Sequence, residues 1–443
     1  MTPKLKHPNT RDGFEKTILK NGLTILTERT PGLRGISLGV WVKAGTRHER
    51  ASEVGISHFL EHMLFKGTES RTATEISRSI ERLGGEFNAF TTREYTCFHI
   101  QLRRQDLHFG SDILCDIILN STFDPLELER ERKVILQEIA MVEDNPEELA
   151  HDIFSELVYG KHGLGRSILG KEHLLKQIRR SDLLRYFRKH YRPDNLVISV
   201  AGDVRHSRII EAFKALERKH WPGRPLKKLS RPEEGFEPAP PLKTGFWWIK
   251  RSSEQSHVVW GVESPRMSAR DHSAADVLAA YLGRGMSSIL FQEIREKYAL
   301  AYSVYSSMHS FKDSGLCTIY VGCSRKQIGT VIKIISESLE RVSQALIDEG
   351  ELSAVKSSLK GELALSHDNV ENLMQANAVD EIYFKNTYSF EQACEEIDQV
   401  KPQDVRRVAR KMFFLRAPSI AVLGQAPTPS LRKRFKPEFP KRF

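Results

Sequence analysis

Apolar residues recur along the chain with two spacings, one typical of strands and one typical of helices. Compact apolar runs at 22–29, 35–45 and 196–203 predict buried strands. Stretches at 105–120 and 182–192 show the apolar spacing of amphipathic helices. Because consecutive strands joined by short turns outnumber strand–helix–strand units, we expect an α+β fold with antiparallel-rich sheets rather than a doubly wound parallel sheet.

The chain contains an internal repeat. A helix followed by a strand between residues 182 and 203 is matched near the C-terminus between residues 404 and 425. Four pairs of identical residues share one offset of 222 positions: Asp182 with Asp404, Arg185 with Arg407, Arg188 with Arg410, and Lys189 with Lys411. A constant offset indicates an aligned repeat, because similar composition alone would not preserve the register.

Each half also begins with two predicted strands. They lie at 22–29 and 35–45 in the first half, and at 245–251 and 255–264 in the second. A turn joins the two strands of each half, so we expect them to pair with each other.

Residues 223–244 are rich in proline, lysine and glutamate and have almost no apolar periodicity, which is typical of an exposed connector. Since 443 residues are too many for one ordinary core, we expect a core on either side of it. We therefore predict an N-terminal α+β domain at 1–225, a linker at 226–244 and a homologous C-terminal domain at 245–443.

Charge and hydropathy narrow the classes of partner. The 67 lysines and arginines exceed the 57 aspartates and glutamates, which gives a net charge of +10. This excess weakly suggests a nucleic-acid binder, but no helix-turn-helix or aromatic–basic motif supports one, so we expect no nucleic-acid partner. No apolar run approaches the roughly 18 residues of a membrane span, so we expect no membrane association.

The five cysteines are odd in number and include no CxxC pair, which argues against a disulfide framework and against a thiolate metal site. Such usage favours a reducing compartment. The N-terminal segment is polar and lacks the apolar middle of a secretory signal. We therefore expect a cytoplasmic location.

The candidate chemistry is concentrated in residues 58–62, within a segment at 52–68 that predicts a mostly buried helix. His58 and His62 are four residues apart, so both imidazoles can face one metal ion, and Glu61 falls within the same arc. Two imidazoles and one oxygen ligand suit a catalytic Zn²⁺, and an unligated carboxylate beside its water can act as a general base. An H-x-x-E-H pattern also arises by chance, in which case the two histidines would be hydrogen-bonded in a core.

A third protein ligand is required, and the acid-rich helical stretch 125–145 is the leading source. Glu131 and Glu138 are two turns apart on one face of it, so Glu131 could reach a histidine or Glu138 as a supporting group. Spacing alone does not choose Glu138 over its acidic neighbours, any of which could lie on a solvated face. The apolar positions expected to face inward around Glu138 are Val134, Ile135, Ile139 and Val142.

These motifs make the chain similar to the inverzincin zinc peptidases of the pitrilysin and insulin-degrading family, most closely to the β subunits of processing peptidases from mitochondria and their bacterial relatives. The segments that follow the family's order and spacing are HFLEHMLFKGT at 58–68, LGGEFNAFTTRE at 83–94, ERKVILQEI at 131–139 and EDNPEELAHDIF at 143–154.

The resemblance implies a zinc-dependent endopeptidase with one Zn²⁺ per chain. It assigns His58, His62 and Glu138 as zinc ligands, with Glu61 as the base that activates a water molecule. It assigns Glu131 as the supporting acid.

In the C-terminal half, residues 285–307 resemble the family segment in which an arginine and a tyrosine seven residues apart reach the zinc site. The matching residues are Arg295 and Tyr302, whose donors would hold substrate carbonyls and a developing oxyanion. Ala299 stands where the family usually has a glycine, and Gly163 where it usually has a proline, so the loops at these two positions are expected to differ.

The resemblance also implies substrate contacts. Asn88, Ala89 and Phe90 match an edge strand with which family members pair extended peptides, although a simple structural turn is the alternative. Phe65 matches the residue that lines the pocket just after the cut. Glu148 and Asp152 match an acidic pair that holds an arginine two residues before it, although these acids alone could form a solvated face. Short or unfolded peptides, including presequence-like ones, are the expected substrates.

Members of this family form two-domain half-shells that close against a second half-shell around a chamber. At 443 residues the chain is expected to supply one half of such a clamshell, as a homodimer or as a heterodimer with a related subunit. The main alternative is a catalytically inactive structural subunit of a larger assembly. The complete set of zinc ligands and base argues against that alternative.

Overall fold

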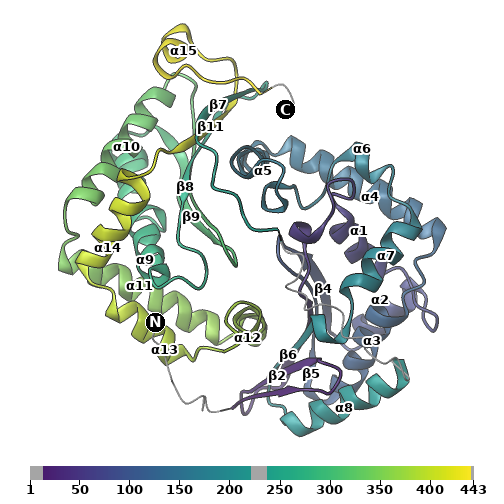
Figure 1. Cartoon of the computed structure of the whole chain (residues 1–443). Helices are drawn as coiled ribbons and strands as arrows, with labels where there is room; N and C mark the ends of the chain where they lie inside the picture. Colours follow the sequence, from purple (N-terminus) through teal and green to yellow (C-terminus); the bar gives the residue numbers. More distant parts are fainter. Residues whose placement is uncertain (1–12, 221–236, 441–443) are drawn as a thin grey trace.

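The computed structural model describes residues 13–220 and 237–440 (Figure 1). Two mixed sheets, one in each half of the chain, are covered by helices, and this confirms the predicted α+β class with two similar halves. None of the helices in these two ranges combines the length and the apolar content needed to cross a bilayer.

The first sheet has the strand order β1-β2-β6-β3-β5-β4, in which the β2–β6 pair is parallel and the other pairs are antiparallel. Its strands are β1 (Phe14–Ile18), β2 (Thr24–Arg29), β3 (Gly35–Val42), β4 (Glu86–Thr91), β5 (Thr96–Arg103) and β6 (Leu196–Gly202).

The second sheet repeats this plan with the order β7-β11-β8-β10-β9 and a parallel β7–β11 pair. Its strands are β7 (Gly245–Lys250), β8 (Ser256–Glu263), β9 (Ala301–Ser310), β10 (Gly315–Cys323) and β11 (Ser419–Gly424).

The expected pairing of the first two strands is wrong in both halves. β6 lies between β2 and β3, and β11 lies between β7 and β8. β6 and β11 are buried along their whole length, so each is more stable in an interior position, where both faces and both edges are covered. The short connections after β2 and β7 permit adjacent pairing but do not require it.

Helices of the first half are α1 (Ile56–Leu64), α2 (Ala73–Glu81), α3 (Leu107–Asn120), α4 (Pro125–Asp144), α5 (Pro146–Tyr159), α6 (Glu172–Leu175), α7 (Arg180–His190) and α8 (His206–His220). Those of the second half are α9 (His272–Gly283), α10 (Ile328–Gln344), α11 (Glu349–His367), α12 (Val370–Phe384), α13 (Phe390–Gln399), α14 (Pro402–Ala409) and α15 (Pro429–Phe435). Two π-helical segments, Phe291–Lys297 and Arg410–Phe414, also lie in the second half.

The two halves exchange one helix each. In the first sheet, one face packs on helices of its own half, and the other face packs on α12 through Leu373 and Met374. In the second sheet, the corresponding outer face packs on α5 through Ile153 and Phe154. Figure 1 shows α12 beside β6 in the first half and α5 beside β7 and β11 in the second.

Glycine permits the close approach of each exchanged helix. A Cβ atom on Gly39 of β3 would lie 3.1 Å from Sδ of Met374 and closer still to the Trp41 ring. A Cβ atom on Gly261 of β8 would lie 2.6 Å from the Phe154 ring. Gly39 and Gly261 are themselves 222 positions apart, so the repeat includes the glycine on which each exchanged helix packs.

Of the predicted linker at 226–244, residues 226–236 lie outside the described part of the chain, and the domain boundaries stay a prediction. Described residues of the predicted linker are attached to both halves. The amide of Ala239 donates to Asp313, and the amide of Lys243 donates to the carbonyl of Val158 in α5.

Candidate metal centre

Helix α1 carries the two histidines, and its start is held by a buried carboxylate. The two oxygens of Glu49 accept hydrogen bonds from the amides of Gly55 at 3.0 Å and Ser57 at 2.9 Å. These amides belong to the first turn of the helix, where no intrahelical acceptor exists. Burial raises the pKa of Glu49 to about 7, although the two amide hydrogen bonds oppose the rise.

The structure brings His58, His62 and Glu138 together. Oε2 of Glu138 lies 3.7 Å from Nε2 of His58 and 3.6 Å from Nε2 of His62. Each residue offers one ligand atom, and these atoms all lie within 4.8 Å of one another. Within residues 13–220 and 237–440, no other group of three or more such side chains meets this condition.

Helix α4 positions Glu138 beside α1, because an apolar residue on the same face of α4 packs in the core that α1 shares. Ile135 is fully buried in the core that also contains Phe59 of α1. Glu131 and Glu138 lie one turn before and one turn after Ile135, so they face the same neighbour. The expectation that Val134 faces inward is wrong, because this residue is 39% exposed.

Glu131 touches the second nitrogen of His62. Its Oε2 atom lies 3.0 Å from Nδ1 of His62, and its Oε1 atom lies 2.8 Å from Nζ of Lys66. Burial would lower the pKa of His62, but the hydrogen bond to Glu131 and the charges of Glu138 and Glu61 outweigh it and raise that pKa. An acceptor at Nδ1 places the imidazole proton there and leaves the Nε2 lone pair for a metal ion.

Glu61 is buried beside this cluster without joining it. Its Oε2 atom accepts a hydrogen bond of 2.5 Å from the hydroxyl of Thr91. Burial raises the pKa of Glu61 to about 7, against the lowering effects of the Thr91 hydrogen bond and of His62. A carboxyl group with a pKa near neutrality can both accept and release a proton.

The donor set fits a zinc ion. Two imidazole nitrogens and one carboxylate oxygen are ligands that Zn²⁺ binds in catalytic sites, where the fourth position remains open. Burial and the neighbouring His62 lower the pKa of His58 to about 3, so its ring is neutral near pH 7, as a metal ligand must be. Nδ1 of His58 is buried and has no hydrogen-bond partner among the residues that the structure describes.

Arg295 and Tyr302 contact each other, and no contact with the His58–His62–Glu138 cluster is found in the described ranges. The guanidinium lies 4.5 Å from the centroid of the Tyr302 ring and donates to the Tyr302 carbonyl at 3.1 Å. Tyr302 is 76% exposed at the start of the edge strand β9. Between them, Ala299 adopts a left-handed conformation with φ of 47°, which explains why glycine is usual at this position in the family that the sequence resembles.

Asn88, Ala89 and Phe90 lie in β4, at the edge of the first sheet. β4 pairs with β5 on one side only, so its other side can accept a further strand. Phe65 follows the last residue of α1 and packs against Phe87 of the same strand, with ring centroids 4.6 Å apart.

Glu148 and Asp152 lie one turn apart on α5. Glu148 is exposed, whereas Asp152 is half-buried and accepts a hydrogen bond from the hydroxyl of Ser167 at 2.8 Å. Arg93 approaches the other oxygen of Asp152 to 3.9 Å.

Three residues that support the cluster were not found from the sequence: Glu49, Lys66 and Thr91. Their roles depend on contacts between distant segments, which residue spacing does not encode. Only Lys66 carried a local signal, because it lies one helical turn after His62 and therefore on the same face.

Comparisons with known proteins identify peptidase family models and relatives that are named as zinc proteases. A model of the insulinase family (peptidase family M16) matches residues 24–172, and a model described as the peptidase M16 inactive domain matches residues 177–359. An uncharacterized zinc protease of Streptomyces coelicolor is 36% identical over 92% of this chain and 89% of its own length. The uncharacterized zinc protease YmxG of Bacillus subtilis is 36% identical over 89% of this chain and 94% of its own length.

Solved structures show the same fold. A protease from Helicobacter pylori aligns with a TM-score of 0.83 and 23% identity, covering 93% of this chain and 99% of that one. A peptidase M16 inactive domain from Pseudomonas fluorescens aligns with a TM-score of 0.84 and 18% identity, covering 94% of this chain and all of that one.

Proposed function

Because the chain belongs to the insulinase family of peptidases, family M16, we propose that it is a zinc-dependent endopeptidase that cleaves short or unfolded peptides. The observation that carries the proposal is the convergence of His58, His62 and Glu138 within 4.8 Å, with the buried Glu61 beside them. One Zn²⁺ per chain would be held by these three side chains.

Zn²⁺ at this position would polarise a water molecule and the carbonyl of the scissile bond. Glu61 would accept a proton from the attacking water and pass it to the leaving amine, which its pKa of about 7 permits. Glu131 would keep the proton of His62 on Nδ1 through the hydrogen bond between them.

The substrate would lie along the free side of β4 and pair its backbone with Asn88, Ala89 and Phe90, which favours extended peptides of little sequence preference. Phe65 would line the pocket just after the cut. Glu148 and Asp152 would bind an arginine two residues before it, which would give a preference for presequence-like peptides.

Arg295 and Tyr302 are assigned to the substrate carbonyls and the oxyanion on the basis of the family resemblance. Both would have to turn from their present contact with each other toward the bound peptide. A partner is also proposed, either a second copy of the chain or a related subunit, with which it would enclose a chamber. We propose a cytoplasmic location, because an odd number of cysteines without a CxxC pair suits a reducing compartment.

Metal analysis combined with peptide cleavage tests the proposed function. The wild-type chain and Glu61→Gln are expected to hold one zinc each, and only the wild type should cleave an unstructured peptide. Equal cleavage by Glu61→Gln would remove Glu61 as the base. A chain that lacks zinc after metal-free purification and zinc addition would instead favour the second candidate, an inactive structural subunit.

A further inference from the structure

The hydroxyl of Thr91 is the direct hydrogen-bond partner of the carboxylate proposed as the base. Its Oγ1 atom donates to Oε2 of Glu61 at 2.5 Å, and both side chains are buried. Among the described residues, no other hydrogen bond to the Glu61 carboxylate is found. Its Oε1 atom therefore accepts no hydrogen bond from these residues. The terminal torsion of glutamate has broad minima, so rotamer preference alone does not fix the plane of this carboxylate.

The strand that carries Thr91 is held in place at that end. Thr91 is the last residue of β4 and pairs with Thr96 of β5. In the turn that follows, the carbonyls of Thr92 and Arg93 accept hydrogen bonds from the amides of Thr46 and Arg47 at 3.2 and 2.8 Å.

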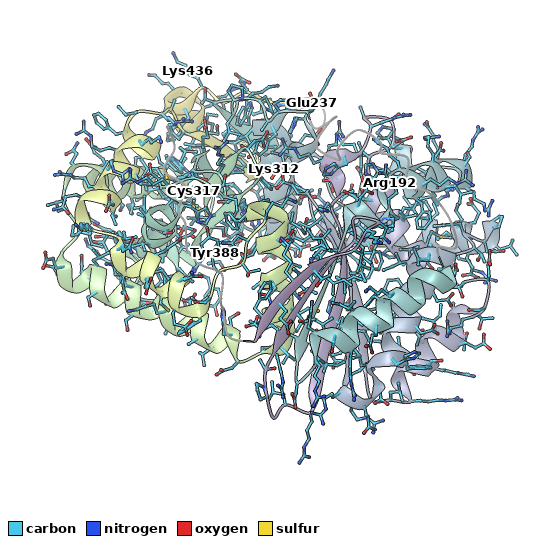
Figure 2. All side chains as sticks on the ribbon, turned by 60° about the horizontal axis from the view of Figure 1, so that its bottom comes forward. Arg192, Glu237, Lys312, Cys317, Tyr388 and Lys436 are labelled. Carbon is cyan, nitrogen blue, oxygen red and sulfur yellow. The ribbon has the colours of Figure 1, made fainter. Side chains whose placement is uncertain are left out.

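Glu94, in the same turn, attaches it to the C-terminal half. Its carboxylate accepts hydrogen bonds from Nη1 of Arg47 at 2.7 Å, from the amide of Lys312 at 3.1 Å and from the hydroxyl of Tyr383 at 2.7 Å. Arg47 also binds both oxygens of Asp313, at 2.7 and 2.8 Å. Figure 2 shows Lys312 at the junction between the two halves, so this anchor uses both of them.

We propose that Thr91 is a positioning residue that fixes the Glu61 carboxylate relative to β4, the strand on which the substrate would lie. The proposal rests on the proposed function. Since Thr91 occupies Oε2, the carboxylate presents Oε1 to the attacking water. The strand that aligns the substrate backbone therefore also aligns the base, and their relative geometry is set before the peptide binds.

The test compares Thr91→Val, which keeps the shape and removes the hydroxyl, with Thr91→Ser, which keeps the hydroxyl. Thr96→Val is the matched control. Thr96 lies opposite Thr91 in the same strand pair, and the two hydroxyl oxygens are 3.4 Å apart. The Thr96 hydroxyl donates to the carbonyl of Ala44 at 3.0 Å, so its removal leaves the hydrogen bond from Thr91 to Glu61 in place. Steady-state cleavage of an unstructured peptide and bound zinc are measured for each variant and for the wild type.

Thr91→Val should lower kcat about tenfold to a hundredfold, as expected for the loss of one hydrogen bond to a charged group, with KM and zinc content unchanged. Thr91→Ser should restore most of kcat, and Thr96→Val should stay within about threefold of the wild type. A Thr91→Val variant as active as the wild type, or one that loses zinc, would overturn this proposal alone. A wild-type chain that binds zinc but cleaves no peptide would overturn both this proposal and the proposed function.

Discussion

Nδ1 of His62 lies 3.0 Å from Oε2 of Glu131, on the side of the imidazole away from the Nε2 atom that faces Glu138. The hydrogen bonds from His62 and Lys66 outweigh the effect of burial and lower the pKa of Glu131, so this carboxylate is ionised near neutral pH. The metal-facing nitrogen of His62 therefore depends on a charge that lies outside the proposed ligand set.

Glu131→Gln should weaken zinc binding about tenfold to a hundredfold, because the amide replaces an ionised acceptor at Nδ1. Competition against a chelator of known affinity measures the change. Glu129→Gln, on the same helix and paired with Arg132 at 2.9 Å, is the control and should bind zinc like the wild type. Equal affinities for all three proteins would contradict the role of Glu131.

Ala299→Gly should stabilise the protein by about 1 kcal/mol, because alanine is strained at a φ of 47° whereas glycine is not. The amide hydrogen bond from residue 299 to the carbonyl of Arg295, 3.1 Å in length, is retained. Urea unfolding of the two proteins tests this. Ala301→Gly, in the neighbouring strand β9, should instead destabilise the protein, and two destabilised variants would refute the strain.

Gly261→Ala should destabilise the protein by about 1–3 kcal/mol, because the added methyl group would lie 2.6 Å from the Phe154 ring. Gly361→Ala, in α11, is the matched control. A Cβ atom at this position would meet nothing within 4 Å, so the substitution should be neutral or slightly stabilising. Unfolding midpoints measured under identical conditions compare the two. Equal unfolding midpoints for the two variants would contradict the close packing of α5 against Gly261.

Acid should destabilise the fold through His190. Burial, followed by the charges of His48, Lys189 and Arg192, lowers the pKa of His190 to about 3. The unfolded chain binds this proton near pH 6.5, so the native state loses stability as the pH falls below 6.5. Between pH 7.5 and 5.5, His190→Phe should lose about 1.4 kcal/mol less than the wild type.

Urea unfolding at the two pH values measures the difference. His272→Phe is the contrasting variant, because the hydrogen bond to Asp276 outweighs burial and raises the pKa of His272. A raised pKa contributes stability that is present at low pH, so His272→Phe should lose more than the wild type on acidification. Identical pH dependence in His190→Phe and the wild type would exclude His190 as a source.

Removing the acidic pair on α5 should reduce arginine selectivity. Glu148→Ala combined with Asp152→Ala should lower kcat/KM about tenfold or more for a peptide with arginine two residues before the cut, with little effect on a neutral analogue. Glu156→Ala, on the same helix and paired with Lys171 at 2.7 Å, is the control. If the double variant kept its selectivity, the acidic subsite would be excluded.

The spacing of apolar residues predicted several helices and strands correctly, but it did not predict which strands and helices lie next to one another. The helices predicted at 105–120, 125–145 and 182–192 correspond to α3, α4 and α7. The insertion of β6 between β2 and β3 was missed, because β6 begins more than 150 residues after β3 ends and no local signal specifies such a contact. The exchange of α5 and α12 was missed for the same reason.

The residues of the candidate site also differ in how far the sequence predicted them. One helical turn is enough to place His58 and His62 on a common face, so their spacing alone predicted a shared ion. Glu138 needed the family resemblance, since spacing did not separate it from the other acids of its helix. Thr91 had neither signal, because a threonine at the end of a strand is common and its contact with Glu61 exists only in the folded chain.

The helix exchange also constrains the order in which the protein is completed on the ribosome. Residues Leu26, Trp41 and Val197 of the first sheet are covered by α12, which ends at Phe384. α5 emerges early, but its own binding surface includes Ala421 and Leu423 of β11. During synthesis, one apolar face of the first sheet therefore stays uncovered until α12 has emerged, and α5 stays undocked until β11, which ends at Gly424, has emerged.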